Sequence, residues 1–318
     1  MSGLIRKAAR EISRGSCHVR IDDAALTVLA ERLLPMPVPV WDHSIHFFDG
    51  GPRTVLYFLL LDALNFCFWP SGFIVHYNGS SYGHDDGYPA LAVGLKRAFE
   101  ADPSFGEPAK LAAMTADELR QVFSGTGEVP LSAERLKQAS NVGQVLTQKF
   151  GGDVTGVLAA GRDGAAALAA AVARDFAAYQ DARTWAGETV PILKRAQIFV
   201  SDLAGAFGSQ GFGAISGLDD LTCFADYKLP QLFRSAGAFV YAPDLDRRIR
   251  ELEIIPADSP AEVEIRGNTI EAIERLKVIL TAHGRPLQSR EIDWLLWHES
   301  LRPGAVTEPH HRTVTTSY

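Results

Sequence analysis

Two segments of the chain are apolar almost throughout, and each carries a carboxylate. The first, Tyr57–Pro70, reads YFLLLDALNFCFWP, and the second, Lys194–Phe207, reads KRAQIFVSDLAGAF. A helix that is hydrophobic on nearly all faces is usually buried in a protein core. The pattern predicts a buried helix from about Thr54 to Trp69, which ends before the proline, and a second helix over 192–209.

Helical periodicity dominates the rest of the sequence. Residues 22–33 open with two aspartates, which suit a helix N-terminus, and Thr115 begins a capping box that Glu118 completes. The strand patterns are few, and the clearest is the run FIVHY that starts at residue 73. We therefore predict a mainly α fold with at most a small β hairpin. Further helices are predicted over 87–101, 115–123, 131–150, 164–174, 228–236, 260–281 and 289–300.

The length of 318 residues is enough for one large core or two modest ones. Because no linker or shift of composition divides the sequence, we expect a single unit over residues 1–318. If the helices form two lobes, the glycine-containing stretch at 151–164 is the place where we expect the chain to divide.

The carboxylates in the two apolar helices indicate a pocket. A buried carboxylate without partners is costly, so it needs a cation, hydrogen-bond donors or a ligand. Asp62, Asn65 and Phe66 fall at positions i, i+3 and i+4, on one face of the first helix. In the second helix Lys194 and Asp202 are about 12 Å apart along the axis, which suits the two ends of one ligand. A helix with one solvated face is the alternative interpretation.

A third segment, Leu221–Gln231, places Asp226 at the start of a short predicted helix. A carboxylate there can accept hydrogen bonds from backbone N–H groups and stay ionised. Capping alone would explain this residue, and the functional alternative is an anionic group at the rim of a pocket. Tyr227 and Lys228 follow it with a ring that can stack and a cation.

The remaining polar and aromatic residues are given structural roles. Arg266 is expected to form a salt bridge with Glu262 or Glu264. Trp294 and Trp297, with His298, lie on the last predicted helix and are expected in the core. The histidines are isolated and no metal-binding, phosphate-binding or dinucleotide motif is present, so we expect neither a metal nor a cofactor.

Charge and composition exclude several kinds of partner. The formal net charge of −7 argues against binding to nucleic acid, which requires clustered Lys and Arg. The three cysteines show no disulfide or metal spacing, which favours a reducing compartment. No apolar stretch reaches the roughly 18 residues of a membrane span, and the first residues contain no signal core. We expect a cytoplasmic protein, and its oligomeric state stays open.

Seven short segments span nearly the whole chain. In sequence order they are HVRID (18–22), LDALNFCFWP, GYPALAVGLKRA (87–98), LKRAQIFVSDLAGAF, LTCFADYKLPQ, VEIRGNTIEAIE and HRTVTTSY (311–318). Together they resemble the queuosine salvage proteins, which are queuosine 5′-phosphate N-glycosylase/hydrolases. The resemblance implies a helical fold related to the helix-hairpin-helix DNA glycosylases. It also implies hydrolysis of queuosine 5′-monophosphate to queuine and ribose 5-phosphate, with no metal or cofactor.

The resemblance gives the candidate residues specific roles. Asp226 is the predicted catalytic carboxylate, which stabilises the positive charge that develops on the ribose. Asp202 is a second catalytic candidate, which recognises the guanine-like edge or orients water. A DNA base-excision glycosylase and a non-catalytic nucleotide-binding helical protein are the alternative functions. The predicted substrate-binding residues are Asp62 and Asn65 for the base, Phe66 and Tyr227 for stacking, Lys194 and Lys228 for the 5′-phosphate, and His46.

Overall fold

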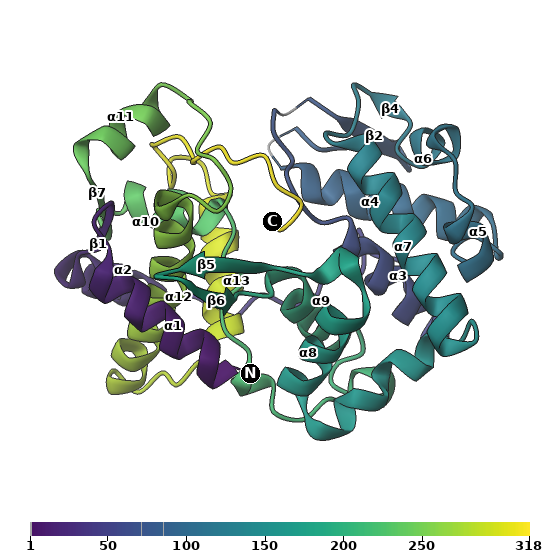
Figure 1. Cartoon of the computed structure of the whole chain (residues 1–318), viewed down its shortest axis with the longest axis horizontal. Helices are drawn as coiled ribbons and strands as arrows, with labels where there is room; N and C mark the ends of the chain where they lie inside the picture. The colour runs from purple at the N-terminus through teal and green to yellow at the C-terminus, as the bar shows by residue number, and fades with distance from the viewer. Residues whose placement is uncertain (1, 71, 85) are drawn as a thin grey trace.

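The helices gather in two lobes that lie side by side (Figure 1). The computed structural model describes residues 2–70, 72–84 and 86–318. The predicted mainly α fold is confirmed. None of the helices in the described ranges is long and apolar enough to cross a membrane.

The first lobe, which we call the mid-chain lobe, is built around α3. Every residue of this helix from Thr54 to Ala63 is buried, because α4, α7 and α9 all pack against it. That arrangement explains why the helix is apolar on all its faces. The helices of the lobe are α3 (Pro52–Ala63), α4 (Gly87–Ala101), α5 (Pro108–Ala112), α6 (Ala116–Val122), α7 (Ser132–Phe150), α8 (Ala165–Asp175) and α9 (Lys194–Ala206), with short 3-10 helices at Val154–Asp163, Ala177–Tyr179, Gly211–Gly213 and Leu218–Asp220.

The second lobe, which we call the terminal lobe, is built around α12 from segments near both chain ends. α1 packs along α12 through Ile12, and a Cβ at Gly267 would lie only 2.6 Å from the Cγ2 atom of Ile12. Only glycine allows this approach. The sequence analysis did not predict α1 or α11. The helices of the lobe are α1 (Ser2–Gly15), α2 (Asp23–Leu33), α10 (Lys228–Ser235), α11 (Pro243–Arg250), α12 (Pro260–Ala282) and α13 (Ser289–Ser300).

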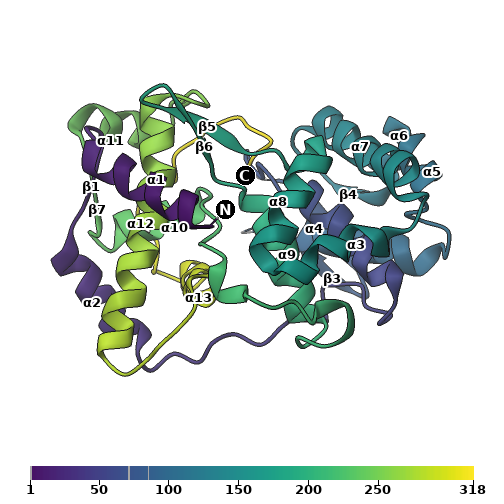
Figure 2. The same ribbon diagram turned by 60° about the horizontal axis from the view of Figure 1, so that its bottom comes forward.

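The strands in the described ranges form three small antiparallel sheets, where the sequence predicted at most one hairpin. The hairpin β5–β6 extends from the mid-chain lobe and contacts α12 and α1 of the terminal lobe (Figures 1 and 2). It therefore ties the lobes together. The pairs are β1 (Val19–Ile21) with β7 (Phe239–Tyr241), β2 (Ile74–Tyr77) with β3 (Ser80–Tyr82) and β4 (Gly125–Thr126), and β5 (Ala182–Trp185) with β6 (Glu188–Pro191).

The first apolar helix ends earlier than predicted. α3 stops at Ala63, six residues before the expected end at Trp69, and an irregular segment follows. Two buried guanidinium groups bind the carbonyl groups that the helix end leaves free. Arg195 donates to the carbonyl of Ala63, and Arg135 donates to those of Leu64 and Phe66. Both arginines come from other helices, so the local pattern could not reveal them.

The predicted domain organisation is not decided by these contacts. The buried hydrophobic residues form two main clusters, one in each lobe. Val154 and Leu168, which lie within and just after the stretch 151–164, both pack in the cluster of the mid-chain lobe. The single unit over 1–318 and the division near 151–164 remain predictions.

Candidate active site

A cavity of about 410 Å³ is lined by residues of both lobes. It brings together all but one of the predicted site residues. Asp62 is the exception, because it lies deeper in the mid-chain lobe and does not line the cavity. The predicted residues that line the cavity are His46, Asn65, Phe66, Lys194, Asp202, Asp226, Tyr227 and Lys228.

Asp226 is held at the start of α10. Its Oδ1 atom accepts hydrogen bonds from the backbone N–H groups of Lys228 at 2.8 Å and Leu229 at 3.3 Å. The capping geometry predicted from the sequence is therefore confirmed. Burial raises the pKa of Asp226, whereas the Lys194 ammonium and the two N–H donors lower it. The side chain is thus a partly buried acid, and two backbone N–H groups stabilise its ionised form.

Asp202 and Asp62 form a second acidic region, on α9 and α3. Burial raises the pKa of Asp202 to about 8, and the nearby Lys194 ammonium opposes that shift. Burial, with the charge of Asp202 added, raises the pKa of Asp62 well above its usual range. Neither oxygen of Asp62 has a hydrogen-bond partner among the described residues. Both shifts favour the protonated form of these acids.

Lys194 is the buried cation between these groups. Its Nζ atom lies 3.5 Å from the carbonyl oxygen of Asn65, and the carboxyl groups of Asp226, Asp62 and Asp293 all favour its charged form. Desolvation nevertheless lowers its pKa. The surroundings of this lysine are acidic, which suits charge compensation inside the cavity better than binding of a phosphate.

The segment between α3 and β2 forms one wall. Phe66 is fully buried, and the guanidinium groups of Arg135 and Arg195 lie 4.4 Å and 5.2 Å from the centre of its ring. The two arginines therefore fix Phe66 and Asn65 at the cavity by binding both the backbone and the ring.

His46 lies at another edge of the cavity and is held on both ring nitrogens. Its Nδ1–H donates to the carbonyl of Asp42 at 2.6 Å, and its Nε2 accepts from the Tyr88 hydroxyl at 2.8 Å. The ring stacks on Trp41 with 4.6 Å between centroids. Burial lowers the pKa of His46 to about 4, so the ring is neutral at pH 7.

Lys228 and Tyr227 extend the site from Asp226. The Nζ atom of Lys228 lies 3.4 Å from Oδ2 of Asp86, and its side chain is partly accessible. The ring of Tyr227 packs against His310 with 4.6 Å between centroids.

The sequence analysis missed several residues of the cavity. Trp294 and Trp297 were expected in the core, but both line the cavity together with His298. Asp293 lines it as well, and its Oδ2 atom accepts the backbone N–H of Phe224 at 2.7 Å. An acid within the apolar run of α13 was the signal that could have identified it, as for Asp202.

The predicted salt bridge of Arg266 to Glu262 is present, but its main partner was not predicted. Its guanidinium group binds Asp181 through two bonds of 2.7 Å, and its distance to Glu262 is 3.9 Å. No three His, Cys, Asp or Glu side chains within the described ranges are grouped so that they could hold a metal ion.

Comparison with known proteins gives the family. The sequence pattern of the family described as "Queuosine salvage protein" matches residues 45–318. The chain belongs to the queuosine salvage protein family. All the predicted site residues lie within the part that matches the family pattern.

Relatives extend this similarity to the whole chain. A protein of Sphaerobacter thermophilus named queuosine 5′-phosphate N-glycosylase/hydrolase is 41% identical over 99% of this chain and 98% of its own length. A Dictyostelium discoideum protein of the same name is 32% identical over the same shares, and one from Mus musculus is 29% identical over 97% and 96%. The likeness to these queuosine salvage proteins therefore includes the residues before 45.

Proposed function

We propose that this chain hydrolyses the N-glycosidic bond of queuosine 5′-monophosphate and releases queuine and ribose 5-phosphate. The observation that carries the proposal is Asp226, a partly buried carboxyl group in the cavity with two backbone N–H donors on one oxygen. The names of the relatives, which align over nearly the whole chain, support the choice of substrate.

The base determines what the enzyme must supply. A 7-deazapurine has carbon in place of the ring nitrogen that purine glycosidases often protonate, so protonation of the leaving group is harder. As the bond between C1′ and the base nitrogen breaks, positive charge develops on the ribose. C1′ then takes the hydroxyl group of water, and the remaining proton goes to the base. Stabilisation of the ribose charge is therefore the larger part of catalysis.

Ionised Asp226 is our candidate for that stabilisation. A fixed carboxylate next to the developing charge in a cavity that excludes water contributes about 3 kcal/mol. The backbone N–H groups of Lys228 and Leu229 keep the carboxylate in place, so it need not reorganise during the reaction. Lys194 offsets the charge that Asp226 brings into the cavity.

Protonated Asp202 is our candidate for recognition of the base. A neutral carboxyl group carries one O–H donor as well as an acceptor, so it can pair with a carbonyl and an N–H of the guanine-like edge. Asn65 adds an amide group to the same cavity, and Phe66 and Tyr227 provide ring surface for stacking. Neutral His46 completes this group without adding charge.

For the 5′-phosphate we keep Lys228 and add Arg290, which lines the same cavity. Lys194 lies among carboxyl groups, so it is better placed to balance their charge than to bind a phosphate.

The free thiols of Cys67 and Cys223, both buried, support the cytoplasmic location that we propose for the enzyme.

The test is incubation of the purified protein with queuosine 5′-monophosphate in the presence of a metal chelator, followed by mass spectrometry. We expect free queuine and ribose 5-phosphate in equal amounts. A folded protein whose melting temperature rises with the nucleotide but which releases no queuine would contradict the proposal and indicate a binding protein.

A further inference from the structure

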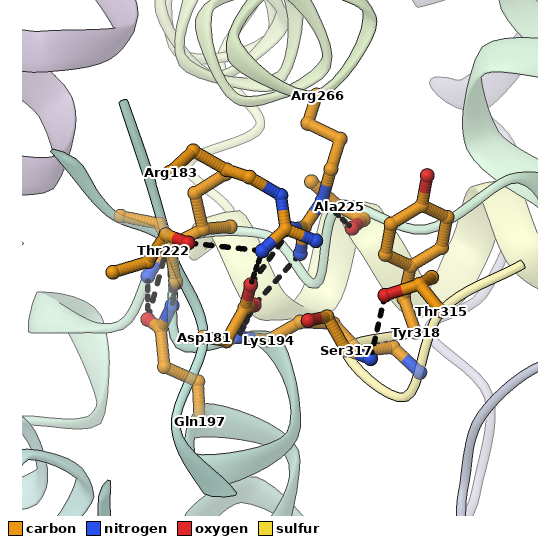
Figure 3. Close-up of polar contacts among 12 residues, drawn as sticks. Asp181, Arg183, Lys194, Gln197, Thr222, Ala225, Arg266, Thr315, Ser317 and Tyr318 are labelled. Atoms are coloured by element: carbon orange, nitrogen blue, oxygen red, sulfur yellow. Dashed lines mark hydrogen bonds and ion pairs between the residues drawn. The ribbon is translucent and has the colours of Figure 1, made fainter. Parts of the chain in front are cut away.

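A buried ion pair lies behind the cavity and joins the two lobes. Nη1 and Nη2 of Arg266 each lie 2.7 Å from one oxygen of Asp181, and both side chains are fully buried (Figure 3). Such a pair costs desolvation energy on both partners and adds little stability by itself. The other bonds that these two side chains make show what else the pair can do.

Asp181 fixes the start of α9. Its Oδ2 atom accepts the backbone N–H of Lys194 at 3.0 Å, and its carbonyl accepts those of Ile192 and Leu193. Leu193 has a φ of 56°, a left-handed conformation that leucine rarely adopts. Strain of this kind persists where the surroundings impose it. The direction in which α9 leaves this point, with Lys194 and Asp202 on it, therefore depends on Asp181.

Arg266 fixes the segment that carries Asp226. Its Nε atom donates to the carbonyl of Ala225 at 3.1 Å, and Ala225 directly precedes Asp226 (Figure 3). The ring of Tyr318, which lines the cavity, lies over the guanidinium group with 4.4 Å between its centre and Cζ. All the strong contacts of Arg266 are thus directed at the site or at Asp181.

We infer that the Asp181–Arg266 pair positions the two halves of the active site, holding Asp226 at a fixed place relative to Lys194 and Asp202. The inference rests on the proposed function. Neither residue lines the cavity, so both act through the backbone of the residues that do. Asp181 and Arg266 together connect the start of α9 in one lobe to Ala225 in the other, and Gln197 of α9 adds a second link through Thr222 (Figure 3).

A neighbouring arginine provides a matched control. Arg183 is also buried and lies 3.4 Å from Asp181, but its remaining bonds go to Glu262, Asp258 and the carbonyl of Ala182. It makes no bond to Ala225 or to the start of α9. Loss of either arginine weakens the same buried network, whereas only Arg266 holds the site.

The experiment compares Arg266→Lys with Arg183→Lys in steady-state hydrolysis, well below the melting temperature of each variant. Lysine keeps the charge but cannot bind Asp181 with two bonds and reach Ala225 as well. We expect kcat of Arg266→Lys to fall by about 10-fold to 100-fold with KM changed by less than about threefold, because misplacement of catalytic groups affects the transition state. Arg183→Lys should keep kcat within about twofold, since Arg183 has a single 3.4 Å contact with Asp181 and its other bonds, to Glu262, Asp258 and the carbonyl of Ala182, lead away from the site. Equal kcat values in the two variants would overturn the inference.

A second measurement does not depend on activity. Hydrogen exchange of the Lys228 and Leu229 amides, which donate to Asp226, should accelerate selectively in Arg266→Lys compared with amides of α7. A uniform increase would mean a merely structural role.

If the wild-type protein releases no queuine, the proposed function fails and this exchange pattern alone decides the inference. If Arg266→Lys does not fold, Asp181→Glu, which keeps both charges, takes its place with the same expectations.

Discussion

The acids in and behind the cavity occupy two contrasting settings, one at the beginning of a helix and the others in the last turn or the interior of two more helices. Asp226 lies just before α10, where backbone N–H groups are free to donate to it. Asp62 lies in the last turn of α3, where the helix dipole disfavours a negative charge and its oxygens accept no hydrogen bond from the residues that the structure describes. Asp202 lies inside α9, where the N–H groups are used within the helix.

The difference teaches that the position along a helix decides what a buried aspartate can do. All three side chains lose hydration, and for each of them burial is the largest cause of a raised pKa. Only Asp226 regains donors that favour its ionised form. We therefore expect Asp226 to act as a charge and Asp202 to act as a neutral hydrogen-bonding group.

The largest effect should follow Asp226→Asn. Removing the carboxylate while keeping the shape should reduce kcat for queuine release by about 100-fold to 1000-fold, because the charge on the ribose loses its partner. Binding of queuine, measured by calorimetry, should persist. Activity close to that of the wild type would remove Asp226 from the catalytic role.

Asp202→Asn should have a smaller effect. Asparagine keeps one donor and one acceptor, so we expect kcat/KM to fall by about 10-fold, mainly through KM. If this variant instead lost as much kcat as Asp226→Asn, the division of roles between the two acids would be wrong.

The stability of the protein should depend on pH through Asp202. Its pKa is near 4 in the unfolded chain and about 8 in the fold, so the native state keeps a proton that the unfolded state has released. The stability that this proton provides is present below about pH 4 and is lost as pH rises towards 8. The free energy of unfolding of Asp202→Asn and of the wild type is measured at pH 5 and at pH 8. From pH 5 to pH 8 the wild type should lose on the order of 1 kcal/mol or more of stability relative to the variant. A difference that does not change with pH would contradict the buried, protonated state.

Asp62→Asn should affect hydrolysis least. This side chain is fully buried and does not line the cavity, whereas that of Asp202 is only partly buried. We expect kcat/KM to stay within about threefold of the wild type, because the substrate does not touch this side chain. A loss as large as that of Asp202→Asn would show that Asp62 takes part in recognition of the base after all.

Most helices could be predicted from local patterns. The capping box at Thr115 and the long helix that ends before Gly151 appear as expected, because caps and periodicity are encoded by neighbouring residues. The end of α3 could not be predicted, since Arg195 binds its last carbonyl from 132 residues away and Arg135 binds the carbonyl of the following residue, Leu64, from 71 residues away. The main partner of Arg266 was missed for the same reason, because Asp181 is 85 residues distant, whereas the predicted Glu262 is only four residues away.

Residues of the candidate site could be predicted from the sequence where an acid interrupts an apolar segment. That signal selected Asp202, and Asp293 had the same signal within α13. It also selected Asp62, because a helix extended to Trp69 would have placed this acid on one face with Asn65. Although α3 ends at Ala63, the two residues remain neighbours, but only Asn65 lines the cavity and Asp62 lies behind it. The relation of the site to the DNA glycosylase fold remains a prediction.

The most direct test of the division between the acids is a carboxyl-carbon NMR titration of the protein labelled at aspartate, with Asp226→Asn and Asp202→Asn to assign the signals. The account predicts that Asp202 titrates near pH 8 and that Asp226 releases its proton at a lower pH than Asp202 does. A titration in which Asp226 remains protonated at a pH where Asp202 is already ionised would contradict it.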